Sequence, residues 1–214
     1  MGKAKDGIFG PFTGKVGNVV GYYSNGQHIL RGVPGKRSKK KVSLAEKNNQ
    51  KKFALVQAWL KPFSYFLKVG FKNYGTKTGG YRAAVSYTLL NAVAGEHPNC
   101  YIDPALVKVS GGNLGFPAEV SMVLEADEQL RFNWSAATEN GDPYDQAMLL
   151  AYNIEKKTLA AKETAAFRQT GTDVLQLCRD KVETSFHVYI GFVAQDRSCQ
   201  SHSKYLGKVT IPGK

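Results

Sequence analysis

The residue types that most often carry chemistry occur in this chain, but not at the spacings that catalysis requires. Residues 10–15 (GPFTGK) resemble a phosphate-binding loop, yet the segment is one residue short. Val16 also stands where such a loop needs a Ser or Thr to hold Mg²⁺. Residues 111–115 lack the dinucleotide-binding spacing and open no expected helix. No Ser lies in a nucleophile elbow, so we expect no catalytic residues.

Potential metal ligands are equally scattered. His97 and Cys100 supply half of a zinc site, and no second pair follows at ligand spacing. Asp142 and Asp145, with Glu139 nearby, could attract a cation weakly, but they do not follow the calcium-loop pattern. A solvated acidic loop is the simpler interpretation. We therefore expect no metal and no cofactor.

Positive charge is the chemical feature that distinguishes this chain. Its 214 residues include 29 Lys and Arg against 17 Asp and Glu, a net charge of +12. Residues 1–80 hold 16 of the basic residues and only two acidic ones, whereas residues 81–214 are close to neutral. Crowded like charges repel one another, so this distribution favours the binding of a polyanion.

The basic residues are densest at positions 36–41, where five of six side chains are Lys or Arg. No base-reading motif accompanies them, so contacts to a phosphate backbone would be tolerant of sequence. The expected polyanion-binding residues are Arg31, Lys36, Arg37, Lys39, Lys40, Lys41, Lys47 and Lys51.

A β-hairpin is expected to precede this basic segment, over residues 19–33. Its turn is Asn25-Gly26, the favoured two-residue type I′ sequence. Gly14, Gly17 and Gly21 indicate bends or close approaches of the backbone in this region. The register that this turn predicts pairs Ser24 with Gln27, Tyr22 with Ile29, and Val20 with Arg31.

A helix is expected after the basic segment, because residues 43–46 (SLAE) fit a capping box. Phe53, Val56, Leu60, Phe63 and Leu67 recur at helical spacing and indicate a core-facing stripe. The opposite side of the same helical wheel carries lysines 47 and 51.

Two further features bound the helical region. Pro62 is expected to kink or divide the first helix, because proline cannot donate a helical hydrogen bond. A second helix is expected over about residues 81–93, with Gly95 as its stop.

The pattern changes to short alternating apolar runs after Tyr101. Seven strands are predicted, at 120–124, 130–134, 147–153, 159–162, 173–178, 186–194 and 204–211. Their number and spacing indicate an antiparallel β-sandwich, in which His187 would be a structural residue of a strand. The expected fold class is α+β, with a hairpin-plus-helical domain over residues 1–100 and a seven-stranded sandwich over 101–214.

Aromatic residues of these strands carry a first resemblance. Trp134, Tyr152 and Tyr189 resemble the buried aromatics of immunoglobulin-like domains of the fibronectin type III kind. The resemblance implies a module for contacts or spacing, and such an architecture does not by itself define a function.

The motif at residues 14–21 (GKVGNVVG) carries a second resemblance. It is similar to the opening of an uncharacterised bacterial family of about this length, placed among domains of unknown function. The likeness continues at residues 60–62, 84–87 and 189–192, and it implies no catalytic residue or cofactor. The opening motif is also similar to small proteins encoded near phage-like structural genes, which implies an assembly role.

Together these features predict a non-enzymatic binding protein of the cytoplasm. Its basic N-terminal part would dock on nucleic acid or another acidic macromolecule, and the sandwich would make protein contacts. No apolar stretch reaches the roughly 18 residues of a membrane span, and no apolar region of a secretory signal follows the N-terminus. Three scattered cysteines are too few for a disulfide framework and suit a reducing compartment.

An alternative prediction belongs to a different class of protein. The chain would be a structural subunit of a phage-like or filamentous assembly, including a homo-oligomer. Its basic arm would contact an acidic face of a neighbouring subunit, formed by the loops at residues 125–128 and 139–145.

Overall fold

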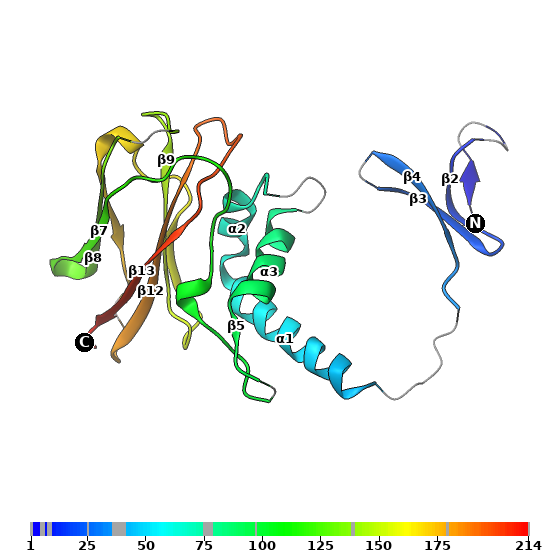
Figure 1. The fold of residues 1–214 in the computed structure, drawn as a ribbon, viewed down its shortest axis with the longest axis horizontal. Coiled ribbons are helices and arrows are strands. Elements are labelled where there is room, and N and C mark those ends of the chain that lie inside the picture. The colour runs from blue at the N-terminus through cyan, green and yellow to red at the C-terminus, as the bar shows by residue number, and fades with distance from the viewer. Residues whose placement is uncertain are drawn as a thin grey trace. The chain divides into compact units, whose positions relative to one another are not determined.

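The fold is α+β, as the sequence predicts, and divides into two compact units, Met1–Leu44 and Ala45–Lys214 (Figure 1). The sequence predicts a domain boundary near residue 100, and the contacts between residues divide the chain at the start of the first helix. The computed structural model describes residues 2–4, 7, 10–24, 26–35, 42–74, 79–96, 98–137, 140–178 and 180–213.

The first unit is an antiparallel sheet that contains the predicted hairpin. Its strands, in spatial order, are β1 (Lys3–Ala4), β2 (Phe12–Val16), β3 (Val19–Ser24) and β4 (Gln27–Gly32). The predicted register is confirmed, since Ser24 lies opposite Gln27, Tyr22 opposite Ile29, and Val20 opposite Arg31. Gly26 has the positive φ that the turn requires, and residue 25 lies outside the described residues.

Gly21 shows why a glycine occupies the middle of β3. A β-carbon at this position would overlap the carbonyl oxygen of Phe12, so of the two predicted alternatives, a bend or a close approach, Gly21 shows the close approach. Gly21 is also the single buried residue among those described in this unit. Apolar side chains such as Tyr23 and Leu30 are each 62% exposed. The described part of the first unit therefore has apolar residues but no buried side chains.

Helices begin the second unit, and the predicted start and division of the first are confirmed. The helical elements are α1 (Leu44–Leu60), the 3₁₀ turn η1 (Lys61–Phe63), α2 (Ser64–Gly70) and α3 (Gly80–Asn91). Helix α1 begins directly after Ser43, where the capping box predicts it. Pro62 lies within η1, which separates α1 from α2.

Two details of the helical region differ from the predictions. Helix α3 ends at Asn91 rather than at Val93, because Val93 pairs with Ile102 in the short ladder of β5 (Val93–Ala94) and β6 (Tyr101–Ile102). Gly95, with a φ of +79°, therefore follows a strand instead of ending the helix. Phe53 is 48% exposed, because the core contacts of α1 begin further along the helix.

All seven strands predicted for the C-terminal part are present. They are β7 (Val120–Leu124), β8 (Gln129–Trp134), β9 (Gln146–Tyr152), β10 (Leu159–Lys162), β11 (Thr172–Gln176), β12 (Thr184–Val193) and β13 (Lys204–Ile211). They form two antiparallel sheets, ordered β10-β9-β12-β13 and β11-β8-β7. Short 3₁₀ turns lie between the elements: η2 (Pro104–Leu106), η3 (Ala126–Glu128) and η4 (Arg168–Thr170).

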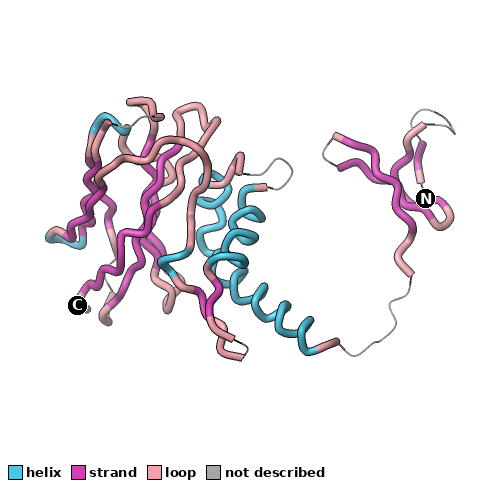
Figure 2. The backbone as a smooth tube through the Cα atoms, viewed as in Figure 1, coloured by secondary structure: helices cyan, strands magenta, loops and turns pink. Residues whose placement is uncertain are grey.

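The four-stranded sheet is the central layer of the second unit. Leu149 of β9 and Ile190 of β12 pack toward the three-stranded sheet, in a sandwich-like core. Leu150 and Tyr189, their neighbours along the two strands, pack instead with the helices. Figures 1 and 2 show the helices against the face of this sheet that lies away from β7 and β8. The helices therefore share a core with one face of this sheet, and the three-stranded sheet shares a second core with the other face.

The two-sided burial of β9 yields a test of this layered arrangement. Leu149→Ala and Leu150→Ala should each lower the free energy of unfolding by about 2–5 kcal/mol, because each removes a buried side chain from a different core. Urea titration of the full chain measures both values. Val123→Ala, on a side chain that is 52% exposed in β7, should change the unfolding free energy by only about 0.5 kcal/mol. A small effect at either leucine would contradict the burial of β9 on both faces.

Candidate functional site

The predicted basic residues that the structure describes lie in both units. Arg31 is an exposed residue of β4, opposite Val20. Lys47 and Lys51 are exposed on α1, one turn apart on the same face of the helix. The other predicted residues, Lys36, Arg37, Lys39, Lys40 and Lys41, lie outside the described residues.

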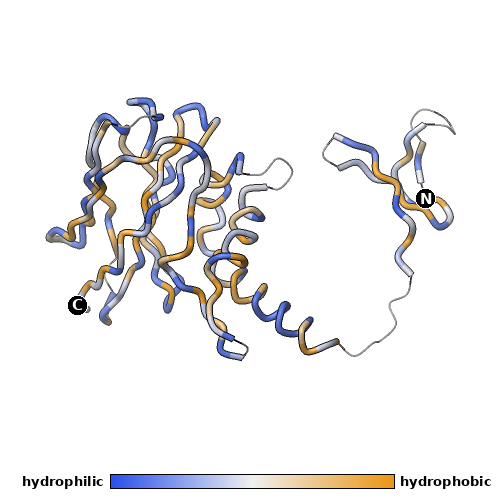
Figure 3. The backbone as a smooth tube through the Cα atoms, viewed as in Figure 1, coloured by the Kyte–Doolittle hydropathy of each residue, from blue (hydrophilic) through white to orange (hydrophobic). Residues whose placement is uncertain are grey.

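Helix α1 keeps its lysines in solvent because its first half contributes no buried side chain. Burial begins at Val56 and continues through Trp59 and Leu60. The residues before Leu55 are exposed or half-buried, and residues 46–52 form a hydrophilic stretch that is blue in Figure 3. Lys47 and Lys51 therefore lie opposite the core face of α1, as the helical pattern predicts.

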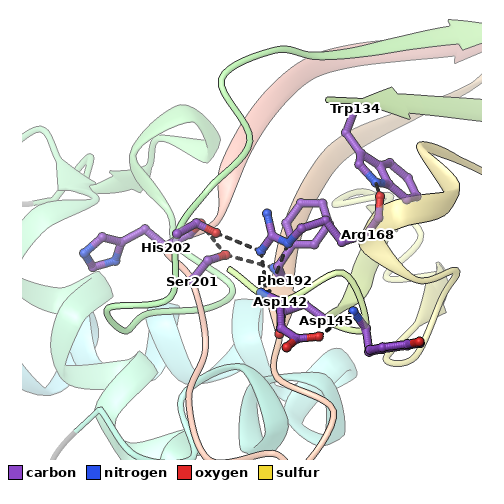
Figure 4. Close-up of polar contacts among 9 residues, drawn as sticks. Trp134, Asp142, Asp145, Arg168, Phe192, Ser201 and His202 are labelled. Atoms are coloured by element: carbon purple, nitrogen blue, oxygen red, sulfur yellow. Dashed lines mark hydrogen bonds and ion pairs between the residues drawn. The ribbon is translucent and has the colours of Figure 1, made fainter. Parts of the chain in front are cut away.

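A buried ion pair is the charged feature that sequence reasoning missed. Arg168 is fully buried in η4, and its Nε and Nη2 donate to Oδ2 of Asp145 at 3.2 and 3.1 Å (Figure 4). Its Nη2 also donates to the carbonyl oxygen of Gly115 at 2.8 Å. The guanidinium lies 4.5 Å from the centroid of the Phe192 ring. The indole nitrogen of Trp134 donates to the Arg168 carbonyl oxygen at 2.9 Å.

This network corrects the interpretation of residues 139–145 as a solvated acidic loop. Asp145 is only 1% exposed, and the cation that it faces is the guanidinium of Arg168. Burial lowers the pKa of Arg168, and the charge of Asp145 opposes that shift. Asp142 stays exposed at the surface, and residue 139 lies outside the described residues. The pair joins the loop before β9 to the turn before β11, which is a structural role.

An open hollow lies beside Asp145. Its volume is about 540 Å³, and its polar lining includes the carboxylates of Asp142 and Asp196, with Ser198 and Cys199 close by. Hydrogen bonds from Ser198 lower the pKa of Asp196. Among the residues that the structure describes, no three His, Cys, Asp or Glu side chains are grouped so as to hold a metal ion.

His187 belongs to a polar contact between strands. It lies on β12, and its Nδ1 is 2.9 Å from the hydroxyl of Tyr205 on β13. Burial lowers the pKa of His187, and the charge of Lys208 lowers it further. Tyr189, on the same strand, donates to the carbonyl oxygen of Pro104 at 2.7 Å, and burial raises its pKa. These contacts suit the structural role expected of His187.

The described helices lack the length and apolar character that crossing a bilayer requires.

Comparison with known proteins gives one match. A family model described as a family of unknown function, DUF6266, matches residues 11–207. This match confirms the resemblance carried by residues 14–21. No curated protein and no solved structure matches the chain.

The buried pair predicts a large difference between two arginines. Arg168→Met should lower the free energy of unfolding by about 3–5 kcal/mol, because Asp145 would remain buried without its counter-charge. Arg131→Met is the matched control, since its pair with Glu125 is more than a third exposed and its loss should lower the free energy of unfolding far less. Urea titration measures both variants, and equal losses would refute the role of Arg168.

His187 predicts a pH dependence of stability. Its pKa in the folded protein is lowered, so the unfolded chain binds the proton more readily. The contribution of His187 is complete above the unfolded pKa of about 6.5 and declines as the pH falls through that value toward the folded pKa. Urea titrations at about pH 7.5 and 5.5 measure how far the free energy of unfolding falls as the pH is lowered. The fall should be smaller for His187→Gln than for the unchanged protein, and the difference should be at most about 1.4 kcal/mol per pH unit. An identical loss in both proteins would contradict this assignment.

Proposed function

We propose that this chain, which belongs to the family of unknown function DUF6266, is a non-enzymatic protein that binds polyanions, nucleic acid foremost. Its basic N-terminal part would dock on the phosphate backbone, and the C-terminal strands would make protein contacts. Binding through phosphates would tolerate different base sequences.

The observation that carries the proposal is the uneven distribution of charge. The first 80 residues hold 16 Lys and Arg against two Asp and Glu. Four acidic residues of the C-terminal part instead form ion pairs with nearby basic side chains. These pairs are Arg131–Glu125, Lys156–Asp180, Lys162–Asp173 and Arg168–Asp145. The C-terminal part thus balances its own charge, and the N-terminal excess calls for an external anion.

The order of the seven strands in their two sheets supports a proposal about the topology of the sandwich. In chain order, the first, second and fifth strands form one sheet, β11-β8-β7, and the other four form the second sheet. This division suits a Greek-key sandwich of the immunoglobulin and fibronectin III kind. Trp134 and Tyr152 are buried on consecutive strands, β8 and β9. We propose this topology as the scaffold for protein contacts.

A second candidate function is a structural subunit of an assembly. The exposed apolar side chains of the first unit, among them Val16, Tyr23 and Leu30, favour it because they suit a protein partner. The acidic face proposed for the neighbouring subunit is weaker than the sequence suggests. Glu125 is already paired with Arg131, and Asp145 is buried.

We also propose a cytoplasmic location. Cys100, Cys178 and Cys199 are free thiols, which suits a reducing compartment.

Salt dependence tests the proposed function. Six phosphate contacts on duplex DNA would give a log–log slope of the binding constant against salt of about −5. Changing Lys39, Lys40 and Lys41 to Gln in the full chain should weaken binding and reduce that slope by up to about 2.7, because three contacts are lost. Fluorescence anisotropy with a labelled duplex measures both quantities.

The matched control changes three exposed lysines of the C-terminal part, Lys157, Lys181 and Lys204, to Gln. It removes the same charge and should leave the slope unchanged. The proposal would be refuted if the protein did not bind at about 50 mM salt, a low concentration for such titrations, or if its binding did not depend on salt. Large ordered particles that persist in mass photometry after nuclease and high-salt treatment would favour the assembly subunit instead.

A further inference from the structure

We infer that one exposed helical face of the second unit binds single-stranded nucleic acid by combining lysine charges with one stacking aromatic ring. This inference rests on the proposed polyanion binding and names the form of the polyanion. The face, here called the lysine–tyrosine stripe, consists of Lys47, Lys51, Ala54, Ala58, Lys61, Tyr65 and Lys68.

The spacing of the stripe places its members on one side of the helices. Successive members are separated by four and three residues in alternation, which is the spacing of one helical face. The run passes from α1 through η1 into α2. Every member is exposed, whereas Val56, Trp59, Phe63 and Leu67 on the opposite side are buried in the core. The stripe therefore faces solvent along its whole length.

Charge along the stripe has a single sign. The elements α1, η1 and α2 together contain five lysines and one acidic residue, Glu46. Glu46 lies in the first turn of α1 and is not a member of the stripe. The two alanines that separate the lysines of α1 from Lys61 are short enough to let a nucleic-acid backbone approach the helix. A polyanion is the complementary ligand for such a face.

Tyr65 is what distinguishes the stripe from an ordinary basic surface. Its side chain is 74% exposed, although it lies between the buried residues Phe63 and Phe66. The ammonium of Lys68 lies over its ring, 5.5 Å from the centroid. An exposed aromatic ring with a cation close to it combines the two contacts that hold unpaired bases, since the other face of the ring can stack on a base while the cation meets the phosphate.

The exposed ring favours a single strand over a duplex. In a duplex the bases are stacked on one another and offer a helix surface mainly phosphates, so Tyr65 would gain no stacking partner. An unpaired base has a free face, and every base can use it, which makes such binding tolerant of sequence.

The experiment compares three probes with the full chain: a 20-nucleotide oligo-deoxythymidine, a duplex of equal length, and heparin, a polyanion without bases. Tyr65→Ala should weaken binding of the oligo-deoxythymidine by about fivefold to a hundredfold, the range typical of a lost stacking contact. It should change binding of heparin and of the duplex less than about twofold, because neither uses stacking. An oligo-uridine of the same length shows whether RNA binds like DNA.

Two further variants separate stacking from folding and charge. Tyr65→Phe keeps the ring and should bind the single strand as the unchanged protein does. Lys61→Gln with Lys68→Gln should reduce the salt slope on the single strand by about 1.4, because two phosphate contacts are lost. Tyr101→Ala, on another exposed tyrosine, is the control and should have no effect.

The outcomes distinguish this inference from the proposed function. If the unchanged protein binds none of the probes at low salt, both are refuted. If it binds all of them and Tyr65→Ala weakens none, polyanion binding stands and the stacking role of the stripe is refuted. Equal weakening of heparin and of the single strand by Tyr65→Ala would also refute stacking.

Discussion

The architecture of the second unit depends on one constraint, which is that its four-stranded sheet must be covered on both faces. Strands β9 and β12 expose almost no side chain, so their neighbouring residues need two separate apolar layers. The three-stranded sheet supplies one layer and the helices supply the other. Because α1 contributes to that cover only with its second half, its first half is left free to display polar side chains. The basic surface is thus a by-product of how the sheet is covered.

Charged side chains are arranged in two different ways in the two parts of this chain. In the C-terminal part, four carboxylates pair with basic groups, and one of these pairs, Arg168 with Asp145, is buried against the ring of Phe192. A buried pair of this kind requires its partners to be positioned accurately, which fits a rigid scaffold. In the N-terminal part, lysines accumulate without comparable numbers of acidic residues. The C-terminal part thus holds both signs of charge in similar numbers, whereas the N-terminal part carries the whole positive excess of the chain.

Local signals were sufficient to predict most elements of the fold. Alternation and turn residues located the seven strands, and Ser43 and Pro62 located the start and the division of the first helix. Non-local pairing was not predictable, so the pairing of Val93 with Ile102 shortened α3 unexpectedly. The burial of Asp145 depends on Arg168, which is 23 residues away, and no sequence spacing reveals such a pair. The shared core was missed for the same reason, since the period of a strand does not show which layer covers it.

The first half of α1 contributes no buried side chain to the core, and this has a consequence for its stability. A helical segment with little tertiary packing depends mainly on its own hydrogen bonds and on its capping residues. The positive charge of Lys47 lies near the N-terminus of α1, where the helix dipole is also positive, and this is unfavourable. The ammonium of Lys51, one turn later, repels the ammonium of Lys47. Neutralisation of these ammonium groups by a bound anion would remove both penalties at once. Amide protons in the opening turns of α1 would then exchange with solvent more slowly. Binding of an anion to these lysines would therefore be detectable as local ordering of α1.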